Sequence, residues 1–412
     1  MKIFIQIASY RDPQLSATLR NCLRNARHPE RLHFCIAHQY DAGEDISEFT
    51  GDHPSGARFT ILEIPYQESQ GACWARHQIQ QNYQGEQFTL HLDSHHRFAK
   101  DWDVTCVNML RGLQAKGFSK PLLTAYLPSF DPDLDPQQRV QEPWRMIFDR
   151  FTPEGVVFFL PVPIPNWRVL SQPIPARFLS AHFTFTLGRH CLEVPHDPDY
   201  YFHGEEISLA VRSFTHGYDL FHPHKVVAWH EYTRKGRVKH WDDDKKWHVR
   251  NTACLKRNRC LLGMELQDPD IDFGEFGLGS VRTFDQYQEY AGIRFHDRAV
   301  QEYTLSSHLP PNPPPTDPKA LWKYPLKRTF SLPDRQVPEQ DYDFWCVAFH
   351  NENGKEIFRK DAIPSELQRV RSSKDNCYKI ERTFYADVKP ARFVVWPHSV
   401  SKGWCGKITI PL

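Results

Sequence analysis

No run of apolar residues in this sequence is long enough to cross a lipid bilayer. The opening residues, Met-Lys-Ile-Phe-Ile-Gln, turn polar at Gln6 and Ser9. They lack the continuous apolar core and the small-residue cleavage site of a secretory signal. We therefore expect a cytoplasmic protein with no membrane span.

Excess charge of either sign is also lacking, because 51 basic residues face 50 acidic ones. Without a basic stripe we expect no nucleic-acid partner. The ten cysteines include no Cys-x-x-Cys pair, which disfavours a thiolate zinc site. In a reducing compartment most of them should be free, buried thiols.

The composition, 40% hydrophobic and 25% charged, is typical of a folded globular protein, and 412 residues predict two or three domains. The segment 309–318 reads Leu-Pro-Pro-Asn-Pro-Pro-Pro-Thr-Asp-Pro and is typical of a stiff linker. We expect a catalytic domain over 1–305, a proline-rich linker over 306–335 and a small β-sandwich-like module over 336–412.

The N-terminal half alternates apolar runs with segments of helical spacing. This order predicts an α/β fold with an open, mostly parallel, Rossmann-like sheet, in which ligands bind beyond the carboxyl ends of the strands. The expected strands are 3–8, 32–37, 59–64 and 88–92, and the expected helices are 15–26 and 72–83.

The next part of the chain has a different character. Residues 127–177 are rich in proline, so we expect an irregular lid or substrate-binding loop there. A strand is predicted over 178–186, and helices are predicted over 205–215, 241–262 and 282–290.

One short motif carries chemistry by itself. A predicted strand ends in Asp93-Ser94-His95. Residues two positions apart on an extended chain point the same way, so Asp93 and His95 could share a divalent cation. A carboxylate and an imidazole suit Mn²⁺ and also tolerate Mg²⁺ or Zn²⁺. A surface turn with incidental polar residues is the alternative interpretation.

Three other segments, 71–76, 202–212 and 226–230, extend the pattern around this motif. Together they resemble the polypeptide N-acetylgalactosaminyltransferases. In that family a strand ending in Leu-Asp-Ser-His provides two metal ligands, a Gly-Gly-Glu-Asn helix covers the donor sugar, and a later histidine completes the metal site. His230 occupies the position of that third ligand.

A fuller resemblance is to glycosyltransferase family 60, and it covers roughly residues 1–300. It is carried by Ile5-Gln-Ile-Ala-Ser-Tyr-Arg-Asp12 and by the run from Gly71 to Trp102. The resemblance implies a GT-A fold and a retaining transfer of N-acetylglucosamine from a UDP donor. The implied acceptor is a serine, threonine or hydroxyproline hydroxyl of a protein or peptide, and the implied cofactor is Mn²⁺ or Mg²⁺.

The resemblance also implies roles for individual residues. Asp93, His95 and His230 would bind the metal, and Glu205 or Glu206 would act on the sugar and acceptor. The residues implied in nucleotide-sugar binding are Ser9, Arg11, Asp12, Arg76, Asp93, Ser94, Arg234 and His240.

Simpler interpretations stay open for several of these residues. Asp12 could cap a helix, Arg76 could be a solvated charge, and glutamates are common at helix N-termini. The sequence His-Gly-Glu-Glu also departs from Gly-Gly-Glu-Asn, which leaves the contacts to an N-acetyl group undefined.

Two other functions are consistent with the residues. A metal-dependent hydrolase could use a cluster of histidines and Asp93 to activate water. The cluster would comprise His91, Asp93, His95 and His96. A non-catalytic carbohydrate-binding or adaptor protein could use exposed tryptophans of the C-terminal module, which are Trp345, Trp396 and Trp404.

Overall fold

The computed structural model describes residues 1–51, 53–372 and 377–412. These residues form two compact units, each of which collects segments distant in sequence. The first comprises Met1–Phe148, Phe159–Ala291 and Ser307–Asn312, and the second comprises Asp149–Phe158, Gly292–Ser306 and Pro313–Leu412. Within the described ranges, no helix combines the length and hydrophobicity that a bilayer crossing requires.

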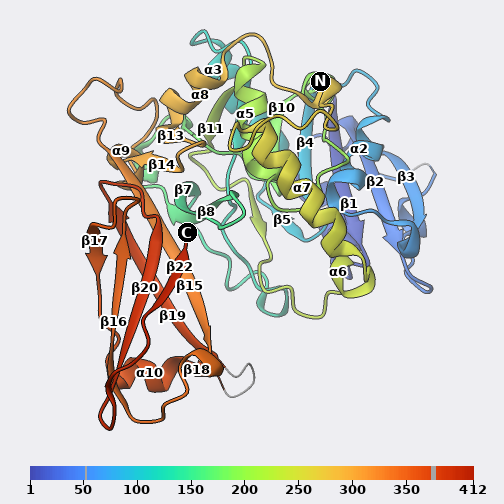
Figure 1. Ribbon diagram of the computed structural model, residues 1–412. Coiled ribbons are helices and arrows are strands. Elements are labelled where there is room, and N and C mark those ends of the chain that lie inside the picture. The colour runs from blue at the N-terminus through green and yellow to red at the C-terminus, as the bar shows by residue number, and fades with distance from the viewer. Residues whose placement is uncertain (52, 373–376) are drawn as a thin grey trace. The chain divides into compact units, whose positions relative to one another are not determined.

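The first unit is built on an eight-stranded sheet in the order β3-β2-β1-β4-β10-β6-β11-β9 (Figure 1). β1 runs parallel to both β2 and β4, whereas β10 runs antiparallel to β4 and β6. The predicted α/β class is confirmed, and the sheet is mixed. In chain order the strands are β1 (Ile3–Tyr10), β2 (Leu32–Tyr40), β3 (Arg58–Pro65), β4 (Phe88–Asp93), β6 (Pro121–Thr124), β9 (Ile174–Pro175), β10 (Phe183–Leu187) and β11 (Asp219–His222).

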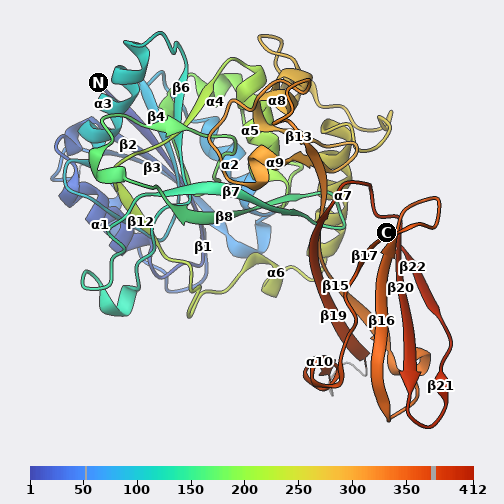
Figure 2. The same ribbon diagram turned by 90° about the vertical axis from the view of Figure 1, so that its left-hand side faces the viewer.

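Helices cover both faces of this sheet, which explains why β1 reads as a continuous apolar run. Successive residues of a strand point to opposite faces. Ile3, Ile5 and Ile7 pack in one core cluster with α1 (Leu15–Asn25) and α3 (Trp102–Gln114), and Phe4 packs in another cluster with residues of α2 (Ala72–Gln80) (Figure 2).

Short elements complete the first unit. β5 pairs with β12, and β7 pairs with β8 in a hairpin whose residues Asp149–Phe158 belong to the second unit. Their bounds, with those of the remaining helices, are β5 (His96–Phe98), β7 (Trp144–Phe151), β8 (Val157–Pro163), β12 (Ala228–His230), α4 (His190–Glu193), α5 (Glu205–Thr215), α6 (His240–Asp243), α7 (Trp247–Leu261) and α8 (Phe284–Ala291).

Two local predictions were wrong. The proline-rich segment 127–177 was expected to be irregular, yet it contains β7, β8 and β9. β7 and β8 form a two-stranded sheet, in which each strand has one unpaired side where proline is tolerated. The helix expected over 241–262 is divided into α6 and α7. Asp244 has an extended backbone there, and its Oδ1 accepts a hydrogen bond from the backbone N–H of Lys246, a competing local turn.

The second unit contains two five-stranded sheets. Large aromatic side chains such as Phe330, Trp345 and Phe393 fill the core between its strands. One sheet has the order β13-β14-β15-β19-β18, and in the other β17-β16-β20-β21 is joined by β22. The bounds are β13 (Ile293–Arg294), β14 (Ala299–Gln301), β15 (Trp322–Pro333), β16 (Tyr342–His350), β17 (Glu356–Arg359), β18 (Arg371–Ser372), β19 (Cys377–Ala386), β20 (Arg392–Ser399), β21 (Gly403–Trp404) and β22 (Ile408–Pro411), with helices α9 (Glu302–Leu305) and α10 (Pro364–Val370).

β15 lies inside the segment predicted as a linker, 306–335, and β13 and β14 precede it. β14 pairs with β15, which in turn pairs along ten residues with β19. The units therefore do not divide in chain order as the predicted boundaries do. The reason is that strand pairing recruits segments on both sides of the prolines.

Acid should weaken the first unit through His222, whose pKa burial lowers to about 4. Its Nδ1–H donates to the carbonyl of Thr124 at 2.7 Å, so the folded chain holds a neutral ring. The unfolded chain takes up a proton near pH 6.5, hence stability is lost as the pH falls from there. The loss at pH 5 should be roughly 2 kcal/mol. Urea unfolding of the His222→Gln variant should show a correspondingly smaller difference between pH 7 and pH 5.

Candidate active site

Strand register brings two polar loops together. Ala8 of β1 lies opposite Asp93 of β4 in a parallel pair, so the residues that follow both strands share one edge of the sheet. β12 reaches the same place from far along the chain, because His230 pairs with His96 of β5. Asp93, His95 and His230 are thereby brought together.

These three side chains are arranged at coordination distance. One ligand atom from each lies within 4.8 Å of the others. The Oδ2 atom of Asp93 is 3.4 Å from Nε2 of His230 and 3.6 Å from Nε2 of His95. One carboxylate oxygen and two imidazole nitrogens form a donor set that suits a divalent transition metal.

Asp12 fixes the orientation of the His95 ring. Its Oδ2 atom lies 2.7 Å from Nδ1 of His95 and also accepts a hydrogen bond from the Ser94 hydroxyl at 2.7 Å. Burial alone would raise the pKa of Asp12, but the bonds from His95 and Ser94 hold it at about 2. An ionised Asp12 favours the proton on Nδ1, which leaves Nε2 of His95 free to bind a cation.

Asp93 is also held as an anion. Burial raises its pKa, but the His230 contact and the Arg76 cation outweigh this and keep the pKa well below its usual range. The Nη2 group of Arg76 donates to Oδ1 of Asp93 at 2.6 Å. Burial and neighbouring His182 lower the pKa of His230, so its imidazole is neutral at pH 7. Both states are those that metal ligation requires.

A cavity of about 180 Å³ opens beside the three ligands. Four aromatic side chains contribute to its wall, namely Tyr10, Tyr201, Phe202 and Trp241. The residues predicted from sequence that line it are Asp12, Asp93, Ser94, His95, His230, Arg234 and His240. The predicted residues outside its lining are Ser9, Arg11, Arg76, Glu205 and Glu206.

Arg11 is used within the protein. Its guanidinium donates to Asp243 at 2.8 Å and to Asp41 at 2.6 Å, and it lies 4.5 Å from the centre of the Tyr66 ring. The Tyr10 hydroxyl donates to the same Asp243 carboxylate at 2.7 Å. Asp243 therefore ties α6 to the end of β1, although its sequence run Asp-Asp-Asp is typical of a solvated surface.

The basic segment after β12 divides into two groups of side chains. Arg234, Arg237, Lys239 and His240 line the cavity. Lys235 points elsewhere and pairs with Asp133 at 2.6 Å. The His240 ring is fixed by the Tyr201 hydroxyl at 2.9 Å and by the carbonyl of Ser69 at 3.1 Å.

Arg237 contacts the ligand shell directly. Its guanidinium touches Nδ1 of His95, lies 3.5 Å from Asp12 and pairs with Glu231 at 2.7 Å. It provides positive charge beside the cavity and close to the three ligands. Arg237 was not among the residues predicted for the site, and the sequence carries no signal for these partners.

The two predicted catalytic glutamates have different surroundings. Glu205 contacts Arg76 and lies 3.1 Å from Nε2 of His196. Burial raises its pKa, but Arg76 and His196 outweigh this and lower it. Glu205 thus lies behind Arg76, which links it to Asp93.

Glu206 accepts hydrogen bonds from the Tyr126 hydroxyl at 2.6 Å and the backbone N–H of Ala181 at 2.9 Å. Burial raises its pKa to about 7. Gly204 permits this helix start, because its φ is +97° and a Cβ would lie 3.0 Å from Cγ of Asn258. The backbone therefore requires a glycine before the two glutamates.

Sequence reasoning missed several histidine contacts in this region. The His182 ring stacks on His230 with centroids 4.1 Å apart, and its Nε2 accepts from the backbone N–H of Leu127 at 3.1 Å. His91 groups with His196 and Glu205 instead of with the Asp93 site. The residues proposed for a hydrolase are therefore divided between different environments.

The tryptophans of the second unit also differ from one another. Trp345 is fully buried, whereas Trp396 and Trp404 are 37% and 48% exposed. The exposed pair lies with ring centroids 4.3 Å apart. Only these two fit the idea of an exposed aromatic surface.

The mixed sheet and the helices on its two faces define a fold of the GT-A type. A solved structure of GalNAc-T7 with UDP, GalNAc and Mn²⁺ matches with a TM-score of 0.50 and 14% identity, covering 93% of this chain and 67% of that one. A structure of S. aureus TarS with UDP gives a TM-score of 0.38 and 10% identity, covering 70% of each chain. No curated protein matches the sequence significantly.

The glycosyltransferase (GlcNAc) family model matches two overlapping segments, residues 2–59 and 52–297. The chain belongs to this family. It is therefore a glycosyltransferase, and the hydrolase and adaptor alternatives are set aside. The match ends at residue 297, just after α8. It therefore includes every residue that was predicted for the site.

Proposed function

We propose that this protein transfers N-acetylglucosamine, or a related sugar, from a UDP donor to a hydroxyl of a protein or peptide. The observation that carries the proposal is the convergence of Asp93, His95 and His230 beside a cavity with cationic and aromatic walls. A sugar nucleotide needs these three features, because its diphosphate is anionic and its base is planar.

The proposed cofactor is Mn²⁺ or Mg²⁺, held by Asp93, His95 and His230. Such an ion, when bound, neutralises the charge that develops on the departing diphosphate. The mixed donor set and the Asp12–His95 hydrogen bond at 2.7 Å support this assignment. GalNAc-T7, whose fold is similar, was crystallised with UDP and Mn²⁺.

Residues of the chain would supply the remaining functions. Arg234 and Arg237 line the cavity and would attract and hold the phosphates. Tyr10, Tyr201 or Trp241 could stack on the uracil ring. Closure of the 231–246 segment over a bound donor would exclude water and favour transfer over hydrolysis.

We further propose a retaining reaction like that of glycosyltransferase family 60, with a serine, threonine or hydroxyproline acceptor. Glu205 would position Arg76 and through it Asp93, because the three side chains form one hydrogen-bonded row. Glu206, with a pKa near 7, could exchange a proton near neutral pH. A cytoplasmic location is supported by the ten cysteines, all of which are free.

A panel of UDP-sugars tests the proposal. The purified full-length chain, incubated with Mn²⁺ and each donor, should release UDP fastest with UDP-N-acetylglucosamine. Chelation with EDTA should abolish release, and Mn²⁺ should restore it. UDP release that is equal with and without EDTA would contradict metal dependence, and no release with any donor would contradict the UDP-sugar assignment.

A further inference from the structure

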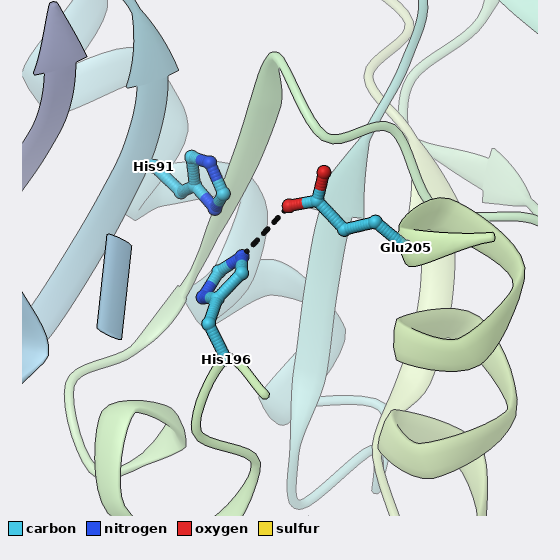
Figure 3. A group of neighbouring side chains, drawn as sticks. All are labelled: His91, His196 and Glu205. Carbon is cyan, nitrogen blue, oxygen red and sulfur yellow. Dashed lines mark ion pairs between the residues drawn. The ribbon is translucent and has the colours of Figure 1, made fainter. Parts of the chain in front are cut away.

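A second group of potential metal ligands lies in the first unit, outside the wall of the cavity. It combines His91 of β4, His196 of the loop after α4, and Glu205, the first residue of α5. One nitrogen of each ring and one carboxylate oxygen lie within 4.8 Å of one another. Figure 3 shows the three side chains converging from their separate elements.

The group is buried and its hydrogen bonding is incomplete. The exposed fractions of His91, His196 and Glu205 are 4%, 3% and 3%. Nε2 of His91 and Nε2 of His196 make no well-formed hydrogen bond in the described part of the chain, although Nε2 of His196 lies 3.1 Å from Oε1 of Glu205. Buried polar atoms are normally paired, so such atoms indicate a missing partner. A cation that accepts imidazole lone pairs is one partner that fits.

The surroundings favour the forms that bind metal. Burial lowers the pKa of His196, and the Arg76 cation helps to lower that of Glu205. A neutral imidazole and an ionised carboxylate follow at pH 7. The two rings lie with centroids 4.7 Å apart at 63°, so their edges approach without stacking.

We propose that His91, His196 and Glu205 bind a zinc ion separate from the ion at Asp93. Two imidazole nitrogens and one carboxylate oxygen are a common zinc ligand set, with a water molecule in the fourth position. This imidazole-rich set favours zinc over Mn²⁺ and Mg²⁺.

The zinc ion would have a positioning role, because none of its ligands lines the cavity. A carboxylate offers about four lone-pair sites, so Glu205 can contact Arg76 and zinc together. Arg76 in turn donates to Asp93 at 2.6 Å. The ion would therefore fix Glu205 and, through Arg76, the Asp93 carboxylate. This inference does not depend on the proposed sugar transfer.

The test measures zinc content and thermal stability on the full-length chain. Protein stripped with a chelator is given Zn²⁺, passed through gel filtration and analysed for metal by mass spectrometry. The His91→Gln and His196→Gln variants should each hold about one zinc ion per chain fewer than the unaltered protein holds. At a hundredfold excess over Kd, zinc should raise the Tm of the unaltered protein by on the order of 5 °C, and less in either variant.

Two further variants make the result specific. His190→Gln is the matched control, because His190 is equally buried but has Ser213 as its partner at 3.0 Å. It should keep both the zinc and the rise in Tm. His230→Gln removes a ligand of the other group, so zinc that this folded variant still binds must lie elsewhere.

The outcomes separate the two metal sites. Zinc retained by His230→Gln and lost on adding His196→Gln supports the proposal. A His230→Gln protein that binds no zinc, or equal zinc content in the unaltered protein and the two glutamine variants, would overturn it. A protein that binds this zinc but transfers no sugar would contradict the proposed function and leave the zinc site intact.

Discussion

Replacing Asp93 by asparagine should lower Mn²⁺-dependent sugar transfer about a thousandfold, because a metal ligand contributes several kcal/mol to stabilising a departing diphosphate. Asparagine keeps the shape of the side chain but removes its negative charge. The change also weakens the hydrogen bond that Arg76 donates to Asp93, which is 2.6 Å long in the unaltered protein. Initial rates of UDP release at saturating donor and Mn²⁺ measure the effect.

Asp219→Asn is the matched control for this experiment. Asp219 is 24% exposed and accepts from Arg282 at 2.6 Å, while Asp93 is 27% exposed and accepts from Arg76 at the same distance. Asp219 does not line the cavity. The control should keep nearly full activity. A folded Asp93→Asn enzyme with more than a tenth of the original rate would show that this carboxylate holds no essential metal.

Replacing Arg76 by methionine should lower the free energy of unfolding by about 3–5 kcal/mol, the cost of breaking a buried ion pair. Arg76 is 4% exposed and is the shared cation of Glu205 and Asp93. Without it, two largely buried carboxylates lose their counter-charge. Urea unfolding of metal-free protein measures the change, since bound cations would mask it.

A double variant separates charge from packing in this prediction. In Arg76→Met/Glu205→Met, both members of the buried pair are apolar, so much of the lost stability should return. Arg282→Met is the control, because Arg282 is 26% exposed and its pair with Asp219 should contribute only about 0–1 kcal/mol. A loss below about 1 kcal/mol in Arg76→Met would contradict the proposed role of its charge.

Several elements could be predicted from sequence because their signals are local. β1 is a mostly apolar run, β4 alternates apolar and polar residues, and both are buried on both faces. α5 begins and ends where its Gly-Glu-Glu start and His-Gly end predict. The Asp-Ser-His motif at the end of β4 is likewise readable, because residues two apart on a strand share a face. The family resemblance then indicated His230.

The segment 127–177 and the helices after residue 240 show the limit of this approach. The proline content predicted an irregular loop, but β7 and β8 pair with each other in a two-stranded sheet. A helical pattern over 241–262 concealed the break at Asp244, which depends on one side-chain hydrogen bond. In both places a tertiary or side-chain contact outweighed local propensity.

The sequence by itself determined the class of sheet, the Asp93–His95 pair and the family. The family resemblance indicated His230, and the tertiary structure brings it to Asp93 from 137 positions away. Only the tertiary structure decided that Asp12 lies behind His95 and that Arg76 lies between Asp93 and Glu205. It also decided that Glu205 faces His91 and His196. The physical reason is that strand register and helix packing fix distances between segments, and neither is written in any single local pattern.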